Sequence, residues 1–345
     1  MDVAKAIGII LVVVGHSGSP FHSYIYLFHM ALFFFISGYF YSDKYTYHPK
    51  KLIFRRLRTL YVPFLLYELL FLLLHNVFLS MNLYSTKVGY LNQVSYAYTI
   101  KDFIKCFLNN VTFAGTEQFA GAFWFFVVLF TINVMFCFIS FFCFRCFRKN
   151  SKTARFLIII LCFIMGMILV AKNIHLPRNM NISLVVLLIY YFGYLFRRIE
   201  NRIPFNIGLF VLSILCLIIA SHYGSIDVLA SHYTNPMFFI FVSLVGIYCT
   251  MYVSRQLDRM NIRVMRFIGS ATISIMALHF LSFKLINLIQ IKMYNYPDFM
   301  LAKFPTIVTN HGWWVLYSLV GIFIPVALHY VYIRINLVIR KDVVY

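Results

Sequence analysis

The chain has 345 residues, of which 62% are hydrophobic, 19% are aromatic and only 12% are charged. A soluble domain cannot keep so much apolar surface away from water, whereas a bundle of membrane-spanning helices exposes it to lipid. The formal net charge of +20 would indicate nucleic-acid binding in a soluble protein, but here Lys and Arg fall in short segments between apolar runs. This is the positive-inside pattern of membrane proteins, so no nucleic-acid partner is expected.

Ten mostly apolar runs follow one another along the chain, each near the roughly 17 to 25 residues that cross the hydrocarbon core. They cover approximately 3–19, 24–41, 56–81, 119–144, 156–172, 182–196, 205–221, 237–254, 267–290 and 313–337. We therefore predict an all-α, polytopic membrane helix bundle of about ten transmembrane helices, with residues 1–345 as a single domain. The first run has no small-residue cleavage site and is expected to remain as a span.

The Lys and Arg residues predict the orientation of these spans. With the N-terminus in the cytoplasm, the inner segments hold 22 Lys and Arg residues and the outer segments hold seven. Because such a bias sets orientation, both termini are expected in the cytoplasm. The longest polar stretches, about 82–118 and 291–312, are then outside, where they are candidates to cover the entrance of a site.

Ionisable side chains inside the apolar runs are the first functional candidates, because they are costly in lipid. At about 1.5 Å of rise per residue, His16 lies roughly 21 Å above the inner end of its run, Glu68 about 20 Å and His279 about 18 Å. His29 lies in the same outer half of the bilayer. These four side chains are predicted to share one layer, although Glu68 as a structural partner of a Tyr or Ser, and His279 bonded to neighbouring backbone, stay open.

A second candidate is the basic stretch Arg55-Arg56-Leu57-Arg58 at the inner end of the third run. Arg55 and Arg58 are three residues apart and are expected on one helix face, where two guanidinium groups suit the oxygens of a polyphosphate. Anchoring at the inner surface explains the same arginines without a ligand. Lys5 lies on the same side, 11 residues before His16.

The seven cysteines, an odd number scattered mostly within the runs, argue against a disulfide framework. Cys143 and Cys146 form a CxxC at the inner end of the fourth run, but no second pair accompanies them. A structural zinc site usually needs four such ligands. No metal is therefore expected.

Residues 2–17, with the sequence DVAKAIGIILVVVGHS, look like the first-span signature of membrane acyltransferase family 3. Phe28-His29-Met30 followed by residues 33–39 (FFFISGY) is similar to the fucose 4-O-acetylase-like branch of that family. Further similarities are the RxxR of Arg55 and Arg58, residues 123–126 (FWFF) and residues 268–279. In span number and order the resemblance covers nearly the whole chain.

The resemblance implies transfer of an acyl group, usually acetyl from cytosolic acetyl-CoA, to a hydroxyl of a cell-surface glycan or its lipid-linked sugar precursor. His16 matches the essential first-span histidine of the family, and Arg55 and Arg58 match its RxxR arginines, which implies acyl-CoA binding there. Lys5 stands where the family usually has arginine, so it keeps the charge but loses the bidentate fork.

The two interpretations combine into a mechanistic hypothesis. The phosphates of CoA bind the inner basic residues, and neutral His16 removes the proton of the acceptor hydroxyl as general base. Glu68 is a candidate to orient the imidazole, while His29 or His279 is a candidate to donate to the developing oxyanion. Trp124 is a candidate to line the acceptor site. A covalent acetyl-histidine relay fits the same residues.

A membrane transporter or flippase for a glycolipid or small anion is the competing function class. Buried histidines can relay protons and arginines can bind an anion, but transporters commonly carry internal repeats, and the sequence has no such symmetry. A non-catalytic scaffold leaves the shared depth of the ionisable groups unexplained. The sequence therefore favours a multi-pass enzyme of a bacterial inner membrane.

Overall fold

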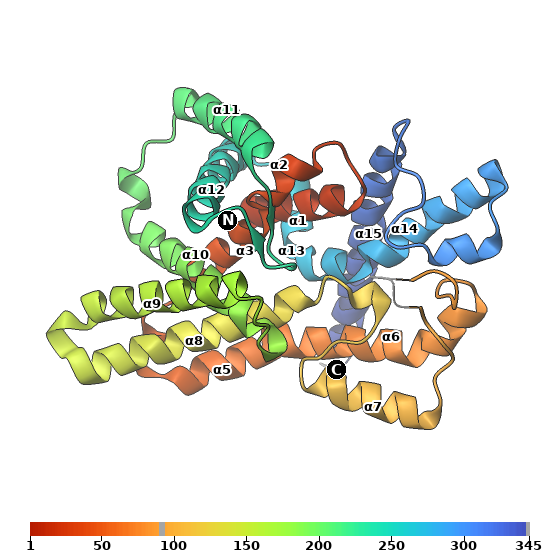
Figure 1. The fold of residues 1–345 in the computed structure, drawn as a ribbon, viewed down its shortest axis with the longest axis horizontal. Helices are drawn as coiled ribbons and strands as arrows, with labels where there is room; N and C mark the ends of the chain where they lie inside the picture. The colour runs from red at the N-terminus through yellow and green to blue at the C-terminus, as the bar shows by residue number, and fades with distance from the viewer. Residues whose placement is uncertain (90–93, 343–345) are drawn as a thin grey trace. The chain divides into compact units, whose positions relative to one another are not determined.

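The computed structural model describes residues 1–89 and 94–342, with side chains as far as residue 336. Residues 90–93, part of the polar stretch expected at 82–118, lie outside it. Within the described residues the only strands are β1 (Ile226–Asp227) and β2 (His232–Tyr233), which form a two-stranded antiparallel sheet; the remaining regular elements are helices (Figure 1). The predicted all-α class is confirmed.

Every predicted run contains a helix. The ten helices that correspond to the runs are α1 (Asp2–His16), α3 (His29–Tyr39), α6 (Val62–Ser80), α8 (Trp124–Phe147), α9 (Ser151–Ala171), α10 (Met180–Ile199), α11 (Ile207–Tyr223), α12 (Pro236–Arg259), α14 (Thr272–Tyr294) and α15 (Trp313–Asp342). Shorter helical pieces join them: α2 (His22–Tyr26), α4 (Lys44–Tyr47), α5 (Pro49–Arg56), η1 (Leu57–Tyr61), α7 (Ile100–Val111), η2 (Gln118–Ala120), η3 (Arg148–Asn150), η4 (Pro177–Asn179), η5 (Glu200–Arg202), α13 (Arg263–Ser270) and η6 (Asp298–Ala302).

Six helical stretches of the described residues are long and apolar enough to cross a membrane. They are Pro49–Ser80, Trp124–Ala171, Pro177–Arg202, Pro236–Arg259, Thr272–Tyr294 and Trp313–Asn336. The second of these, at 48 residues, contains both α8 and α9. The protein is thus a helical, multi-pass membrane protein, while the total of ten spans and the cytoplasmic termini stay predictions.

The run at 24–41 differs from the continuous helix expected there. It is divided into α2 and α3, and Phe28 between them leaves the helical conformation, with φ −147° and ψ −17°. The Phe28 ring packs over Gly246 of α12, where an added Cβ would lie 2.0 Å from the Phe28 Cγ atom. Uninterrupted apolar sequence carries no sign of this break, because the packing partner is distant in the chain.

The third run also differs from a simple helix. It begins at Pro49, earlier than the expected residue 56, with proline in the first helical turn, where its missing N–H is not needed. A π-helical turn, η1, then separates α5 from α6. Because Arg55 lies before this turn and Arg58 within it, the two arginines do not share one regular α-helical face.

The chain divides into two compact units that alternate along the sequence. Unit 1 contains Met1, Ser23–Leu66 and Phe123–Met260, and unit 2 contains Asp2–His22, Tyr67–Ala122 and the residues from Asn261 onward. The α6 helix begins in unit 1 and continues in unit 2. Each unit thus combines early and late parts of the chain.

In unit 1, α10 is the central helix, since it packs against α3, α8 and α9, and α8 and α9 lie side by side (Figure 1). Two glycines allow α3 and α10 to approach backbone to backbone. A Cβ on Gly38 would lie 1.9 Å from the Tyr190 carbonyl oxygen, and a Cβ on Gly193 would lie 1.9 Å from the Phe35 carbonyl oxygen. Small residues of this kind support close packing of membrane helices.

In unit 2, α14 packs along α15, and α1 contacts α13, α14 and α15. Gly269 of α13 brings α1 close, because a Cβ there would lie 2.1 Å from the carbonyl oxygen of Asp2. The far end of α1 is attached to α15, where the Ser318 hydroxyl donates to Ser17 Oγ over 3.0 Å. These contacts fix the position of His16 at the end of α1.

Candidate functional site

His16 and His279 form the centre of the candidate site, in unit 2. His16 is the last residue of α1 and is half-buried, whereas His279 lies within α14 and is completely buried. His16 Nδ1 lies 3.0 Å from His279 Nε2, and the two rings are nearly parallel, with an interplanar angle of 9°. Two of the four ionisable residues expected in one layer are therefore in direct contact.

The backbone around His279 determines which nitrogen carries its proton. His279 Nδ1 lies 3.0 Å from the carbonyl oxygens of both Ile275 and Met276, and these oxygens can only accept. A neutral His279 therefore carries its hydrogen on Nδ1 and offers the lone pair of Nε2 to His16. His16 then donates through Nδ1–H, which puts its own lone pair on Nε2.

Aromatic side chains surround this pair. The Phe280 ring lies 4.9 Å from the His16 ring and 4.0 Å from the His279 ring, measured between centroids, and Phe283 lies 5.7 Å from His279. One turn further along α14, the buried Lys284 donates from Nζ to the Lys303 carbonyl oxygen over 2.8 Å. The two imidazoles are thus surrounded by the rings of Phe280 and Phe283, and the buried Lys284 follows on the same helix.

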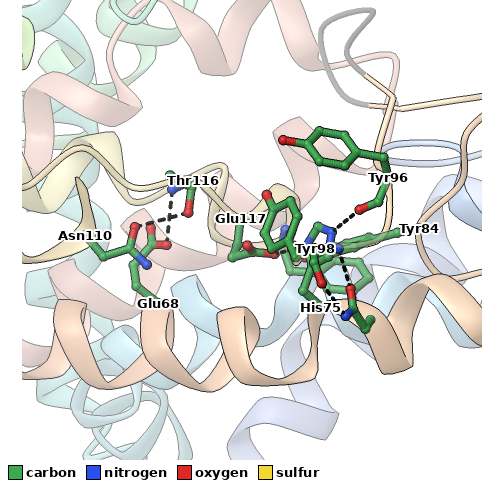
Figure 2. A network of polar contacts seen from close by, with 10 residues as sticks. Glu68, His75, Tyr84, Tyr96, Tyr98, Asn110, Thr116 and Glu117 are labelled. Carbon is green, nitrogen blue, oxygen red and sulfur yellow. Dashed lines mark hydrogen bonds and ion pairs between the residues drawn. The ribbon is translucent and has the colours of Figure 1, made fainter. Parts of the chain in front are cut away.

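Glu68 lies in unit 2 but has other partners than His16. Its Oε2 atom accepts from the backbone N–H of Thr116 over 3.4 Å, and its Oε1 atom packs against Gly115, where a Cβ would lie 2.2 Å away (Figure 2). Within the described residues, the hydrogen bonds of Glu68 do not include His16. The side chain that contacts the His16 ring nitrogen is His279, not Glu68, which is the sequence candidate for orienting His16.

A second polar group, which the apolar runs do not predict, lies further along α6. His75 Nδ1 lies 3.0 Å from Glu117 Oε2, and His75 Nε2 lies 3.0 Å from the carbonyl oxygen of Tyr96 (Figure 2). Both partners are acceptors, so a His75 ring that satisfies both is protonated and forms an ion pair with Glu117. The Tyr98 ring stacks on His75 with centroids 3.5 Å apart.

Burial makes this second group a structural connection between α6 and the segment that follows it. The side chains of His75 and Glu117 are 3% and 0% exposed. Burial beside Glu117 also raises the pKa of Tyr84 well above its usual value of 10. The sequence contained one signal for this group: His75 is seven residues after Glu68, two helical turns along the same face of α6.

Lys5 lies on α1 with its charge already paired. Its Nζ atom is 2.7 Å from Asp2 Oδ1, one turn earlier in the helix. The hydrogen bond from Lys5 holds the pKa of Asp2 below its usual value. A donor phosphate at Lys5 would share the ammonium with this carboxylate.

The arginines of the RxxR lie in unit 1 and have different surroundings. Arg55 is exposed and donates from Nη1 to the Tyr45 hydroxyl oxygen over 2.6 Å. Arg58 is exposed in the π-helical turn. Neither is buried, so both are accessible to a ligand at this end of unit 1.

His29 and Trp124 also belong to unit 1. His29 is buried at the start of α3, and its Nδ1 lies 2.9 Å from the Ile25 carbonyl oxygen, so this nitrogen carries the hydrogen in a neutral ring. A neutral His29 then presents Nε2 as an acceptor, which does not suit donation to an oxyanion. Trp124 is half-buried at the start of α8, beside Phe125.

The cysteines of the CxxC remain thiols. Cys143 is buried and Cys146 is exposed, and neither is in a disulfide. In the described part of the chain, no group of three or more His, Cys, Asp or Glu side chains is arranged to hold a metal ion.

Comparison with known proteins gives one match. The family model described as an acyltransferase domain covers residues 1–330 and so includes residues of both units. The searches of the curated proteins and of the solved structures found no match.

Proposed function

The chain belongs to the membrane acyltransferase family whose model it matches, and we propose that it moves an acetyl group from cytosolic acetyl-CoA to a hydroxyl. The acceptor in this proposal is a cell-surface glycan or its lipid-linked sugar precursor, and the membrane is a bacterial inner membrane. The observation that supports it most is the contact between His16 Nδ1 and His279 Nε2, because it provides an oriented imidazole at the end of α1.

In the proposed reaction, His16 is the general base. His16 Nε2 takes the proton of the acceptor hydroxyl while the oxygen attacks the thioester carbonyl carbon and a C–O bond forms. The tetrahedral intermediate then breaks its C–S bond, and the CoA thiolate takes the proton back from the imidazolium of His16. The products are the O-acetyl ester and free CoA, so proton and charge balance.

His279 is a positioning residue in this proposal. Its Nε2 accepts the Nδ1–H of His16 before and after proton transfer, so His16 keeps one tautomer and one ring orientation. The carbonyl oxygens of Ile275 and Met276 accept from His279 Nδ1 and hold its ring in place. The proposed base, His16, is therefore oriented by His279, which is itself oriented by the backbone of α14. Because His279 Nε2 is an acceptor here, oxyanion stabilisation is assigned to other donors.

The donor enters, in this proposal, at the inner end of unit 1, where Arg55 and Arg58 are exposed. Trp124 remains the proposed acceptor-side residue, on the basis of its aromatic surface and its half-buried position. Lys5 contributes positive charge that it shares with Asp2.

The test is transfer of radiolabelled acetyl from acetyl-CoA in membranes that contain the full chain and the native surface polysaccharide. We expect His16→Ala to lose at least a hundredfold in acetylation, since general-base catalysis typically contributes about 10²–10⁴-fold. His22→Ala is the control, because His22 is an exposed histidine just beyond the same helix. Unchanged transfer by a folded His16→Ala variant would refute the proposal.

A further inference from the structure

The α7 helix exposes apolar side chains although it belongs to a stretch that is polar in sequence. They lie on one helix face and form the apolar stripe of α7: Ile100, Ile104, Phe107 and Leu108. Their exposed fractions run from 44% at Phe107 to 80% at Ile100. A different face packs against the rest of unit 2, since Phe103 contacts the Tyr98 ring edge-on and Asn110 is buried. Because such a stripe is unfavourable in water, it calls for an apolar partner.

Hydrogen bonds near both ends of α7 show that it runs back along the second half of α6, in the opposite direction (Figure 1). Before α7, the Tyr98 N–H donates to Asn76 Oδ1 over 2.8 Å, and Asn76 Nδ2 donates to the Tyr98 carbonyl oxygen over 3.0 Å. After α7, the Thr116 N–H donates to Glu68 Oε2 over 3.4 Å (Figure 2). Asn76 follows Glu68 by eight residues, which is about 12 Å along α6. The α7 helix therefore returns from the level of Asn76 to the level of Glu68.

Both levels lie within the depth of a membrane. They belong to the stretch Pro49–Ser80, which is long and apolar enough to cross one. Between them, the exposed residues of α6 are Leu70 and Leu73, which are side chains that a membrane-crossing helix presents to lipid. In the orientation predicted from Lys and Arg, Asn76 is near the outer boundary of the hydrocarbon core. The apolar stripe of α7 is then at the depth of the outer leaflet.

The charges of α7 are confined to its first half. They are Lys101, Asp102 and Lys105, whereas residues 106–111 carry no charge. Asp102 Oδ2 accepts from the N–H and the hydroxyl of Thr99, over 2.9 and 2.7 Å, in a capping box at the helix start. The two lysines are exposed, and such side chains extend to headgroups while their stems follow apolar surface. This distribution suits a helix that enters lipid with its first turn at the surface, because charge is costly further in.

The turn that follows α7 satisfies its backbone donors within the chain, as a turn inside lipid must. The N–H groups of Phe113 and Ala114 donate to carbonyl oxygens in the last turn of α7, over 3.1 and 2.8 Å. The Thr116 hydroxyl donates to Asn110 Oδ1 over 3.2 Å, and the Thr116 N–H is the one that Glu68 accepts (Figure 2). Glu68 thereby attaches the deep end of this segment to α6.

We propose that α7 is inserted into the outer leaflet of the membrane beside α6, with its apolar stripe in contact with lipid acyl chains and Lys101 and Lys105 at the phosphate headgroups. Residues 100–111 then lie in lipid and not in the water outside. The inference goes beyond the proposed function. It rests on the multi-pass membrane fold and not on acyl transfer, so each is tested separately.

The test is tryptophan fluorescence of the full chain in vesicles of phosphatidylcholine and phosphatidylglycerol, with bromine as quencher either near the glycerol or near the methyl end of the acyl chains. Leu108→Trp and Ile100→Trp place the probe at the two ends of the apolar stripe, and Lys105→Trp is the matched control, exposed on the same helix but off the stripe. The signal of wild type, which contains three tryptophans, is subtracted. We expect Leu108→Trp to be quenched by bromine at least about twofold more than Lys105→Trp, because an apolar helix face is buried among the acyl chains. Ile100→Trp should respond most to bromine near the glycerol and Leu108→Trp to bromine near the methyl end, since eight residues separate them by about 12 Å.

Acrylamide, a quencher in the aqueous phase, distinguishes the other outcomes. Strong quenching of Leu108→Trp by acrylamide without quenching by bromine would show that α7 lies in water and would overturn the inference. Protection from both quenchers would show that protein, such as a second copy of the chain, covers the stripe, and would overturn it as well. Equal responses of Ile100→Trp and Leu108→Trp to both bromine positions would contradict insertion along α6. Should Leu108→Trp fail to fold, Phe107→Trp on the same stripe gives the same measurement.

Discussion

Replacement of the buried ion pair His75–Glu117 by leucines separates the net contribution of the pair from the cost of breaking it. His75 Nδ1 and Glu117 Oε2 are 3.0 Å apart, and both side chains are almost fully buried. His75→Leu leaves the Glu117 carboxylate buried without its cation, which typically costs about 3–5 kcal/mol of unfolding free energy. Glu117→Leu leaves a buried histidine without its anion and should destabilise similarly.

The double variant should be more stable than the sum of the single effects predicts. With both charges removed, the remaining losses are the stack of His75 on Tyr98 and the hydrogen bond from His75 to the Tyr96 carbonyl oxygen, each worth about 0.5–1.5 kcal/mol. We therefore expect a coupling of at least about 2 kcal/mol, since a hydrophobic replacement of a buried pair is often close to neutral.

The assay is equilibrium unfolding in mixed micelles titrated with SDS, followed by circular dichroism. His175→Leu, at an exposed histidine, is the control and should change stability by less than about 0.5 kcal/mol. Single-variant effects that add within about 0.5 kcal/mol would show that the two side chains are not coupled and would refute the reasoning.

Three further predictions concern the site, the helix packing and a helix end. His279→Phe should lower kcat for acetyl transfer about 10–100-fold with little change in KM, because His16 loses its acceptor; equal effects on both constants would contradict a positioning role. Gly193→Leu should cost about 1–3 kcal/mol by forcing α10 away from the Phe35 carbonyl, and an unchanged SDS midpoint would contradict that close approach. The Thr99 side chain holds the pKa of Asp102 below 3.8, so this cap stabilises α7 above about pH 4 and is lost as the pH falls through the lowered pKa. Hydrogen exchange of α7 should show that loss in wild type and not in Asp102→Asn.

The helices of this protein could be predicted from its apolar runs, because length and composition suffice to identify a membrane span. Breaks in the helix inside an apolar run could not be predicted from length and composition. The interruption at Phe28 depends on Gly246, more than 200 residues away in the sequence, and the π-helical turn after Arg56 has no recognised residue signature. Both features arise from tertiary packing.

Some residues of the candidate site could be predicted from the sequence, but the contacts between their side chains were harder to predict. Counting residues from the span ends put His16 and His279 at similar depth, and the structure brings them into contact. The same counting put Glu68 in that layer, but depth does not specify direction around a helix axis, and Glu68 faces the backbone of Thr116. Glu117 carries no comparable sequence signal, because it lies in a polar connection, where a carboxylate is usually solvated.

The contact between His16 and His279 joins residues 263 positions apart, one in the first helix and one in the last but one. During synthesis on the ribosome, the first helix is inserted long before its partner exists. A chain that stalls or is truncated before α14 therefore carries His16 without the partner that its ring contacts in the folded protein. In the proposed mechanism such a chain lacks an oriented base, so acyl transfer would begin only when translation is nearly finished.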